Sequence, residues 1–283
     1  IQKTFGNPEP GDVVTLKDFK DRPLGVAIYN PQSQIVARRI SRRKQKLDAE
    51  FFLRRLGQAI NYRESLAIEQ NLRRIIWSES DGLPGVIVDQ YGDHLVLQTT
   101  TLAMDQRKDL IVSCLVELLA PKSITLRNDS SMRRPEGLEQ EIVMVHGNQP
   151  DPFTVSHHDS IFEVDPANGQ KTGLYLDIMD SYQKVALLAP GKKVLDLFCN
   201  QGGFSLACAL AGAQSVRAVD ISEDATTAAA KNAELTGVQI EAITANAFDF
   251  LRKHNETYDL IILDPPSFTR NKKTVKDAMR GYK

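Results

Sequence analysis

Residues 193–204 read KVLDLFCNQGGF, a nearly all-apolar strand that runs into a loop with two adjacent glycines. The segments that follow alternate between helical and apolar extended patterns as far as residue 264. The predicted elements are a helix at 204–213, a strand at 215–220, a helix at 222–237, a strand at 240–244, a helix at 247–254 and a strand at 258–264. Such alternation is typical of a parallel sheet covered by helices on both faces. The sequence therefore predicts an α/β, doubly wound fold in the C-terminal part of the chain.

Acidic residues accompany three of these strands. Asp196 lies in the first strand, Asp220 ends the second, and Asp264 ends the fourth, where Pro265 and Pro266 follow it. In open α/β sheets ligands bind outside the carboxyl ends of the strands, so these side chains mark one candidate site. The Asp196 carboxylate suits a cationic ligand end such as an ammonium, and an acid at Asp220 can accept the hydroxyls of a ribose. The glycines do not follow the GxGxxG spacing of a dinucleotide site, and the two prolines predict a stiff loop.

The chain before residue 192 lacks this alternation. Short apolar stretches at 13–16, 25–29 and 34–40 predict a small β-rich unit. Helical spacing begins at Leu47, and a hairpin is predicted around residues 91–93. A helix at 105–119 and strands at 123–127, 141–146, 153–157 and 161–165 complete an α+β middle segment. We expect three domains, at residues 1–44, 45–165 and 166–283.

Positive charge gathers near the N-terminus. The 283 residues carry a net charge of −1, yet residues 1–60 hold 12 Lys or Arg against 6 Asp or Glu. The densest group comprises Arg38, Arg39, Arg42, Arg43 and Lys44. Clustered cations are typical of a surface that contacts nucleic-acid phosphates, since phosphate neutralisation supplies most non-specific affinity. A solvated linker explains the same pattern, and charge alone favours neither interpretation.

Several functional classes are disfavoured by composition. No apolar run approaches the length of a membrane span, so we expect a cytoplasmic protein without a membrane partner. Three cysteines without CxxC spacing indicate neither a disulfide framework nor a zinc site, and the pair His157-His158 lacks a third ligand, so no metal is expected. We interpret Cys114, Cys199 and Cys208 as buried small residues, Phe51 and Trp77 as core, and Arg133-Arg134 as a solvated face.

The motifs together resemble a known family. The stretch DLFCNQGGFS from Asp196, the acid at Asp220 and DPPSF from Asp264 are similar to the S-adenosylmethionine site of class I methyltransferases. Residues 169–177, GQKTGLYLD, resemble the GQKTG-F/Y-F/Y-LD element of the bacterial 23S rRNA cytosine-5 methyltransferases that carry an N-terminal PUA domain. Residues 78–98 and the segment 11–41 are similar to that family's central domain and PUA domain. The resemblance covers essentially the whole chain, and the family's protein is expected to extend beyond both ends of it.

The resemblance implies a Rossmann-like methyltransferase sheet, S-adenosylmethionine as cofactor, large-subunit ribosomal RNA as partner, and a homodimer as a further expectation. The implied cofactor-binding residues are Lys171, Thr172, Asp177, Asp196, Phe198, Cys199, Asn200, Gly202, Asp220, Asn246, Ala247 and Phe248. Asp264, Pro265 and Pro266 would face the target base, and the 38–44 cations would contact RNA. The nucleophilic cysteine of the family is expected beyond Lys283, so the chain as given is expected not to methylate cytosine.

Two departures from the family pattern keep alternatives open. The family follows Leu-Asp with Gln-Arg and a further Arg, where this chain has Ile178, Met179 and Tyr182. Asn246 stands where an Asp is usual. The alternatives are methylation of another rRNA base, guanine, and a non-catalytic RNA-binding protein that retains the fold. A nicotinamide dehydrogenase is disfavoured by the missing GxGxxG.

Overall fold

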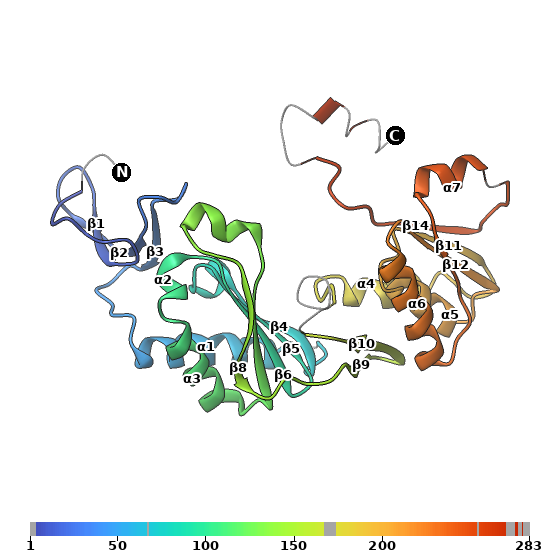
Figure 1. Ribbon diagram of the computed structural model, residues 1–283, viewed down its shortest axis with the longest axis horizontal. Coiled ribbons are helices and arrows are strands. Elements are labelled where there is room, and N and C mark those ends of the chain that lie inside the picture. Colours follow the sequence, from blue (N-terminus) through green and yellow to red (C-terminus); the bar gives the residue numbers. More distant parts are fainter. Residues whose placement is uncertain are drawn as a thin grey trace. The chain divides into compact units, whose positions relative to one another are not determined.

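The computed structural model describes residues 4–66, 68–166, 174–253, 255–269, 275–276 and 279. The chain forms two compact units (Figure 1). The first comprises residues 1–153 and 164–176, and the second comprises residues 154–163 and 177–283. Within the described ranges, no helix combines the length and the apolar character needed to cross a bilayer.

The first unit begins with a three-stranded antiparallel sheet. Its strands are β1 (Val13–Lys17), β2 (Pro23–Tyr29) and β3 (Ala37–Ser41), in the order β1-β2-β3. The predicted β-rich unit is confirmed. Strand β3 begins at residue 37 rather than 34, because residues 31–36 turn and the Asn30 N–H closes that turn on the Val36 carbonyl at 2.9 Å.

A five-stranded mixed sheet follows, in the order β4-β5-β6-β7-β8. The strands are β4 (Leu72–Trp77), β5 (Val86–Tyr91), β6 (His94–Thr99), β7 (Ser123–Asn128) and β8 (Glu141–Gly147), and only β6 and β7 are parallel neighbours among them. The predicted hairpin is confirmed, with Tyr91 opposite His94. The sequence pattern does not predict β4, because Arg73 and Arg74 interrupt its apolar run.

The described residues of this unit form three α-helices and two 3-10 helices. They are α1 (Ala49–Glu64), α2 (Leu102–Asp105), α3 (Lys108–Leu119), η1 (Ser78–Asp81) and η2 (Ser131–Glu136). Helix α1 begins where the Asp48 carboxylate accepts the Phe51 N–H at 3.1 Å. The single helix predicted at 105–119 is instead two helices, which break at residues 106–107.

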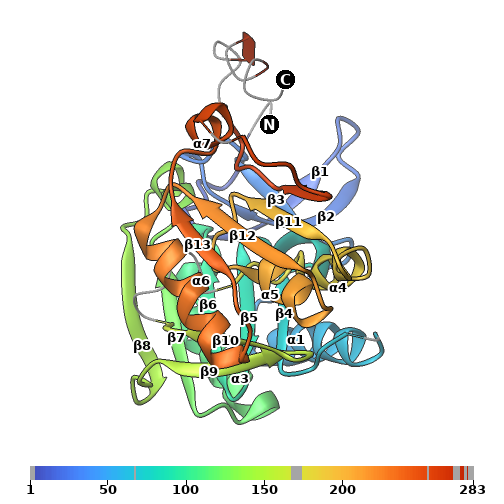
Figure 2. The same ribbon diagram turned by 90° about the vertical axis from the view of Figure 1, so that its right-hand side faces the viewer.

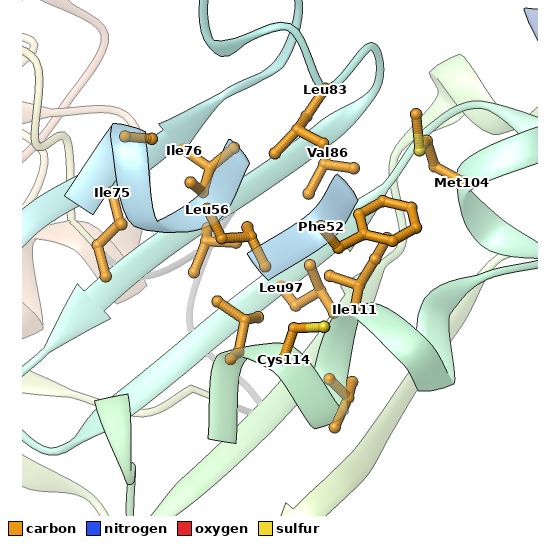
Figure 3. Close-up of a cluster of buried hydrophobic side chains, with 14 of the residues drawn as sticks. Phe52, Leu56, Ile75, Ile76, Leu83, Val86, Leu97, Met104, Ile111 and Cys114 are labelled. Atoms are coloured by element: carbon orange, nitrogen blue, oxygen red, sulfur yellow. The ribbon is translucent and has the colours of Figure 1, made fainter. Parts of the chain in front are cut away.

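Helices α1 and α3 bury one apolar face each against the five-stranded sheet. Figure 3 shows Phe52 and Leu56 from α1 gathered with Leu97, Ile111 and Cys114. Burying one such large side chain contributes about 1.5–3 kcal/mol. This cluster is the main core of the first unit, and Val26, Ile28 and Ile40 of the N-terminal sheet join it.

Glu136 links the N-terminal sheet to the five-stranded sheet. Its side chain is 4% exposed and accepts hydrogen bonds from Asn30 Nδ2 at 2.8 Å and from Ser33 Oγ at 2.5 Å. The Leu102 N–H donates to the same carboxylate at 3.3 Å. Because a buried carboxylate is costly without hydrogen bonds, these donors fix the junction.

Two predictions about single side chains are wrong. Arg133 is 2% exposed rather than solvated, because it donates to Asp105 Oδ1 at 2.8 Å and to the Glu139 carbonyl at 2.7 Å. Trp77 is 46% exposed rather than core, whereas Phe51 is buried as predicted. Arg134 is exposed.

The second unit contains a four-stranded parallel sheet in the order β13-β12-β11-β14. Its strands are β11 (Lys193–Leu197), β12 (Ser215–Asp220), β13 (Glu241–Thr244) and β14 (Leu260–Leu263), preceded by the hairpin β9 (Phe153–His157) and β10 (Ser160–Val164). The helices are α4 (Met179–Ala186), α5 (Gly203–Leu210), α6 (Glu223–Thr236) and α7 (Ala247–Lys253). Alternating strands and helices are confirmed, and α4 is an additional helix.

Two apolar clusters lie on opposite faces of this sheet. Neighbouring residues of a strand point to opposite faces, and Val194 packs with Cys208 of α5 whereas Leu195 packs with Ala247 of α7. Figure 2 shows α6 running alongside β12 and β13. Helix α6 begins at the Ser222 cap and ends at Gly237 in the left-handed region, as predicted. Covered faces leave the carboxyl edge of the strands as the place for a site.

Candidate functional site

The loop after β11 is tied to the end of β12. The Asn200 N–H donates to Asp220 Oδ2 at 3.0 Å, and the Ser222 N–H donates to Asp220 Oδ1 at 2.9 Å. Parallel strands bring both segments to the same edge, so one carboxylate orders the loop and the start of α6. Each carboxylate oxygen can accept a further hydrogen bond, and Asp220 is only partly buried.

The backbone of this loop is unusually contorted. Phe198, Asn200 and Gly202 have φ angles of 62°, 49° and 82°, all in the left-handed region. Such conformations cost non-glycine residues of order 1 kcal/mol or more and gather at ligand sites. A Cβ on Gly202 would lie 3.0 Å from the Ala229 Cβ of α6, so a side chain here would crowd the helix below.

Gly203 is packed against an aromatic ring. A Cβ at this position would lie 2.3 Å from Tyr182 Cζ, and Tyr182 meets Phe204 edge-on with ring centroids 4.7 Å apart. Met179 and Tyr182 are 4% and 8% exposed. Two of the three residues that replace the family's Gln-Arg and Arg are therefore buried, and Tyr182 packs against the start of α5.

Asp196 lies beneath the loop and is 1% exposed. Its Oδ2 accepts the Ser205 hydroxyl at 2.7 Å. Burial raises the pKa of Asp196 to about 7, the Ser205 hydrogen bond opposes that rise, and the charges of Asp264 and Asp220 add to it. A cation placed near this carboxylate would favour its ionised form. Ser205 carries no sequence signal beyond its place in the motif.

Three phenylalanine rings meet at the same edge, and each comes from the end of a different strand. Phe198 follows β11, Phe248 lies at the start of α7, and Phe268 follows β14. Their ring centroids lie 6.4 Å apart for Phe198–Phe248, 6.1 Å for Phe198–Phe268 and 5.8 Å for Phe248–Phe268. Phe268 is absent from the predicted site residues, because its position depends on the path of the proline loop.

Asn246, which is predicted to contact the cofactor, also caps helix α7. Its Oδ1 accepts the N–H groups of Phe248 at 3.0 Å and Asp249 at 3.3 Å, so it caps α7. Ala247 is buried beneath it. The carbonyl that could accept an amine is thus engaged, while the amide nitrogen remains a donor.

Asn232 of α6 was missed by sequence reasoning, because a buried asparagine inside a helix gives no pattern. It is 1% exposed. Its Oδ1 accepts the Glu163 N–H of β10 at 2.9 Å, and its Nδ2 donates to the Gln201 carbonyl at 3.1 Å. This one amide joins the loop to the hairpin.

The remaining predicted residues are unevenly placed. Asp264, Pro265 and Pro266 follow β14, whose Leu263 pairs with Leu197, so they lie level with the loop. Asp177 is exposed just before α4. Lys171 and Thr172 lie outside the described residues.

The basic group of the first unit is divided by its ion pairs. Arg38 is paired with Glu79 at 2.7 Å and lies 3.7 Å from Glu136, so its charge is largely committed. Arg39, Arg42, Arg43 and Lys44 are exposed. Four of the five predicted cations can therefore meet a polyanion.

No cysteine here is an apparent nucleophile. Cys114, Cys199 and Cys208 are free and buried, as predicted. Burial raises the pKa of Cys114 and of Cys199 above the ordinary value and that of Cys208 to about 12, so all three are thiols at neutral pH. Within the described residues, no group of three His, Cys, Asp or Glu side chains could hold a metal ion.

Comparison with known sequences matches both halves of the chain. Residues 134–281 match the S-adenosylmethionine-dependent methyltransferase family, and residues 1–42 match a PUA-like domain. A protein named ribosomal RNA large subunit methyltransferase I from Erwinia tasmaniensis is 36% identical over 293 residues, covering 100% of this chain and 74% of that protein. Its namesake from Aeromonas salmonicida is 37% identical over 293 residues, with the same coverage.

Solved structures agree with the fold. One described as a SAM-dependent methyltransferase from Streptococcus mutans has a TM-score of 0.80 at 24% identity and covers 97% of this chain and 75% of that one. Another, described as a methyltransferase complexed with SAH, has a TM-score of 0.81 at 26% identity and covers 95% of this chain and 71% of that one. With its PUA-like N-terminal domain and its Rossmann-like sheet, this chain belongs to the S-adenosylmethionine-dependent methyltransferase family.

Proposed function

We propose that this methyltransferase acts on ribosomal RNA of the large subunit, and that it methylates cytosine at C5. The observation that carries the RNA substrate is the 36–37% identity, over the whole chain, with proteins named for that activity. The exposed cations of residues 39–44 support it, because they offer phosphate contacts. The division into domains at 44/45 and 165/166 remains part of the proposal.

The residues at the carboxyl edge fit S-adenosylmethionine. The left-handed backbone at Phe198, Asn200 and Gly202 is of the kind that gathers at ligand sites, which supports a ligand at this loop. Asp196 would face the cationic methionine end, together with Phe198, Cys199, Asn200 and Gly202. Asp220 would accept the ribose hydroxyls through the lone pairs that its two backbone donors leave open.

The adenine would lie against the phenylalanine rings. Phe198 and Phe248 offer apolar faces beside Ala247. The side-chain carbonyl of Asn246 already caps α7. We therefore propose that the Asn246 amide nitrogen contacts the adenine, by donating a hydrogen bond to a ring nitrogen. The resemblance assigns Lys171, Thr172 and Asp177 to the cofactor as well, and we keep this assignment in the proposal.

The target base would stand between the cofactor and Asp264, Pro265 and Pro266. The cofactor supplies the electrophilic methyl group when bound. The base would first have to be unstacked from its RNA. Methyl transfer to C5 also requires a thiolate that adds to C6, makes C5 nucleophilic toward the methyl group and is expelled when the C5 proton is lost, and the three buried thiols of this chain do not meet that need. The C5 assignment therefore requires a thiolate from elsewhere.

Two measurements test the proposal. Calorimetry with SAH, the demethylated product of S-adenosylmethionine, tests the cofactor site. No detectable binding would contradict that site. Methyl transfer from radiolabelled S-adenosylmethionine to unmodified large-subunit RNA, followed by mass spectrometry of the nucleosides, tests the base. We expect 5-methylcytidine when the protein assayed also carries a cysteine thiolate at the target base. Methylguanosine as the product would replace the C5 assignment. Transfer that Cys199→Ala abolishes would overturn our view of that thiol.

A further inference from the structure

We propose that Trp77 is a stacking platform for an unpaired RNA base on the first unit, an inference that rests on the proposed action on RNA. Trp77 ends β4, an edge strand of the five-stranded sheet. It remains 46% exposed, although an indole side chain would bury a large apolar area in a core.

The exposed ring is held in place by a buried polar framework. The guanidinium of Arg74 lies over the ring, 4.6 Å from its centroid. Arg74 is itself fixed by a bidentate pair with Asp89, at 2.7 and 2.9 Å, and Asp89 is fully buried. One ring face is therefore occupied by a cation, and we infer that the exposed area includes the opposite face.

The backbone at Trp77 is fixed as well. Its N–H donates to Asp81 Oδ2, and Arg63 Nη2 donates to the same carboxylate oxygen at 2.8 Å. The Arg63 and Asp81 side chains are 11% and 10% exposed. A rigid exposed aromatic loses little conformational freedom when a base stacks on it, which favours binding.

The charges around this ring fit a polyanion. The three neighbouring acids Glu79, Asp81 and Asp89 pair with Arg38, Arg63 and Arg74. The Arg38–Glu79 pair also brings the basic residues 38–44 beside the turn that follows Trp77. Residues 39–44 can then contact phosphates while the indole stacks on a base, the combination that single-strand binders use. A second copy of the chain would meet its own cations here, so RNA is the favoured partner.

The chain offers a direct test, because Trp77 is its only tryptophan. We would titrate the full chain with a single-stranded oligouridylate of about 12 nucleotides. Tryptophan emission would be followed in parallel with the anisotropy of the same RNA carrying a fluorescent label. Stacking should quench the emission and protect it from acrylamide, with the same dissociation constant as the anisotropy. Unchanged emission at saturating RNA would overturn the platform and leave RNA binding intact.

Substitutions sharpen the test. Trp77→Ala should weaken RNA binding about 5- to 150-fold, as expected for one stacked base, and Trp77→Phe should restore most of it. Phe19→Ala is the matched control, because Phe19 is also an exposed aromatic residue beside a cation. It lies in the turn between β1 and β2 and is 87% exposed, with the Lys20 ammonium 5.5 Å from its ring centroid. This change should alter the RNA affinity less than twofold. Circular dichroism melts check that the variants fold.

Other outcomes are decisive too. Equal losses for Trp77→Ala and Phe19→Ala would contradict a specific platform. A change of sedimenting mass on Trp77→Ala, with unchanged RNA affinity, would assign the ring to self-association and overturn the proposal. No anisotropy change with any RNA would contradict both the platform and the RNA substrate, whereas SAH binding measured separately would still support the cofactor site.

Discussion

The loop after β11 and the segment after β3 differ in what makes them functional. In the loop, residues 198–203, the backbone angles, the glycines and the neighbouring carboxylates of Asp196 and Asp220 define the site. In the segment after β3, the exposed ends of the long side chains among residues 38–44 define the surface, and ion pairs decide which of these cations are available. The difference teaches that a backbone-built site tolerates few substitutions, whereas a side-chain surface loses function in small increments.

The largest effect is expected at Asp220. Replacing it with alanine removes the acceptor for the Asn200 and Ser222 N–H groups and the proposed ribose contact. Affinity for SAH should fall about 10- to 150-fold, since charge-assisted hydrogen bonds contribute about 1.5–3 kcal/mol. Calorimetry measures this. Asp249→Ala, an exposed acid on α7, is the control, and equal affinities for both variants would remove Asp220 from the site.

A second test addresses the packing of the loop. Gly203→Ala would force a Cβ to 2.3 Å from Tyr182 Cζ, so the free energy of unfolding should fall by about 1–3 kcal/mol. Adding Tyr182→Leu should recover part of the loss. Gly57→Ala in α1 meets no atom within 4 Å and should be neutral or stabilising. Urea denaturation followed by circular dichroism compares the three, and a neutral Gly203→Ala would show that the loop is loosely packed.

The third test uses pH. The pKa of Asp196 is raised to about 7, so the folded protein binds a proton that the unfolded chain releases near 3.8. Its contribution to stability is therefore fully present below about 3.8 and is lost as pH rises through 7. A cationic ligand needs the ionised form, so SAH affinity should fall about tenfold per pH unit below 7 and level off above it. Asp196→Asn should flatten this profile, and an unchanged profile would contradict the assignment.

The smallest effect is expected in the basic segment. Changing Arg42, Arg43 and Lys44 together to alanine should lower the slope of log affinity against log salt by about 2, at 0.7–0.9 per phosphate contact. Arg38→Ala should leave the slope unchanged, because Glu79 and Glu136 already neutralise that cation. Filter binding at several salt concentrations measures both slopes. Equal slopes for all variants would make the segment a solvated linker.

Sequence reasoning predicted what repeats locally. Strands β11 and β12 are buried on both faces and read as apolar runs, and Ser222 and Gly237 mark the ends of α6. The order of Asp196, Asp220 and Asp264 predicts a candidate site at one edge, and the parallel strands do bring these three positions to that edge, while their role in binding stays a prediction.

What escaped prediction depends on partners far along the chain. The predicted environment of Arg133 is wrong because Asp105 pairs with it in the interior. That of Trp77 is wrong because Arg74 and Asp81 hold it at the surface. Strand β4 was missed because its arginines find acids on a neighbouring strand or helix. The cap at Asn246 is the exception: an asparagine just before a helix is a local signal that was available.

Glu136 has a consequence for exchanging parts of the molecule. Its carboxylate accepts hydrogen bonds from Asn30 and Ser33, in the turn between β2 and β3, and from the Leu102 N–H at the start of α2. A chain cut after residue 44 would separate Glu136 from two of its hydrogen-bond donors, Asn30 and Ser33. If a relative's N-terminal sheet were grafted onto this chain, it would have to place two equivalent donors at the same positions. We therefore expect that the PUA-like sheet can be exchanged without loss of stability only together with the turn at residues 131–136, because the buried carboxylate would otherwise lose hydrogen bonds.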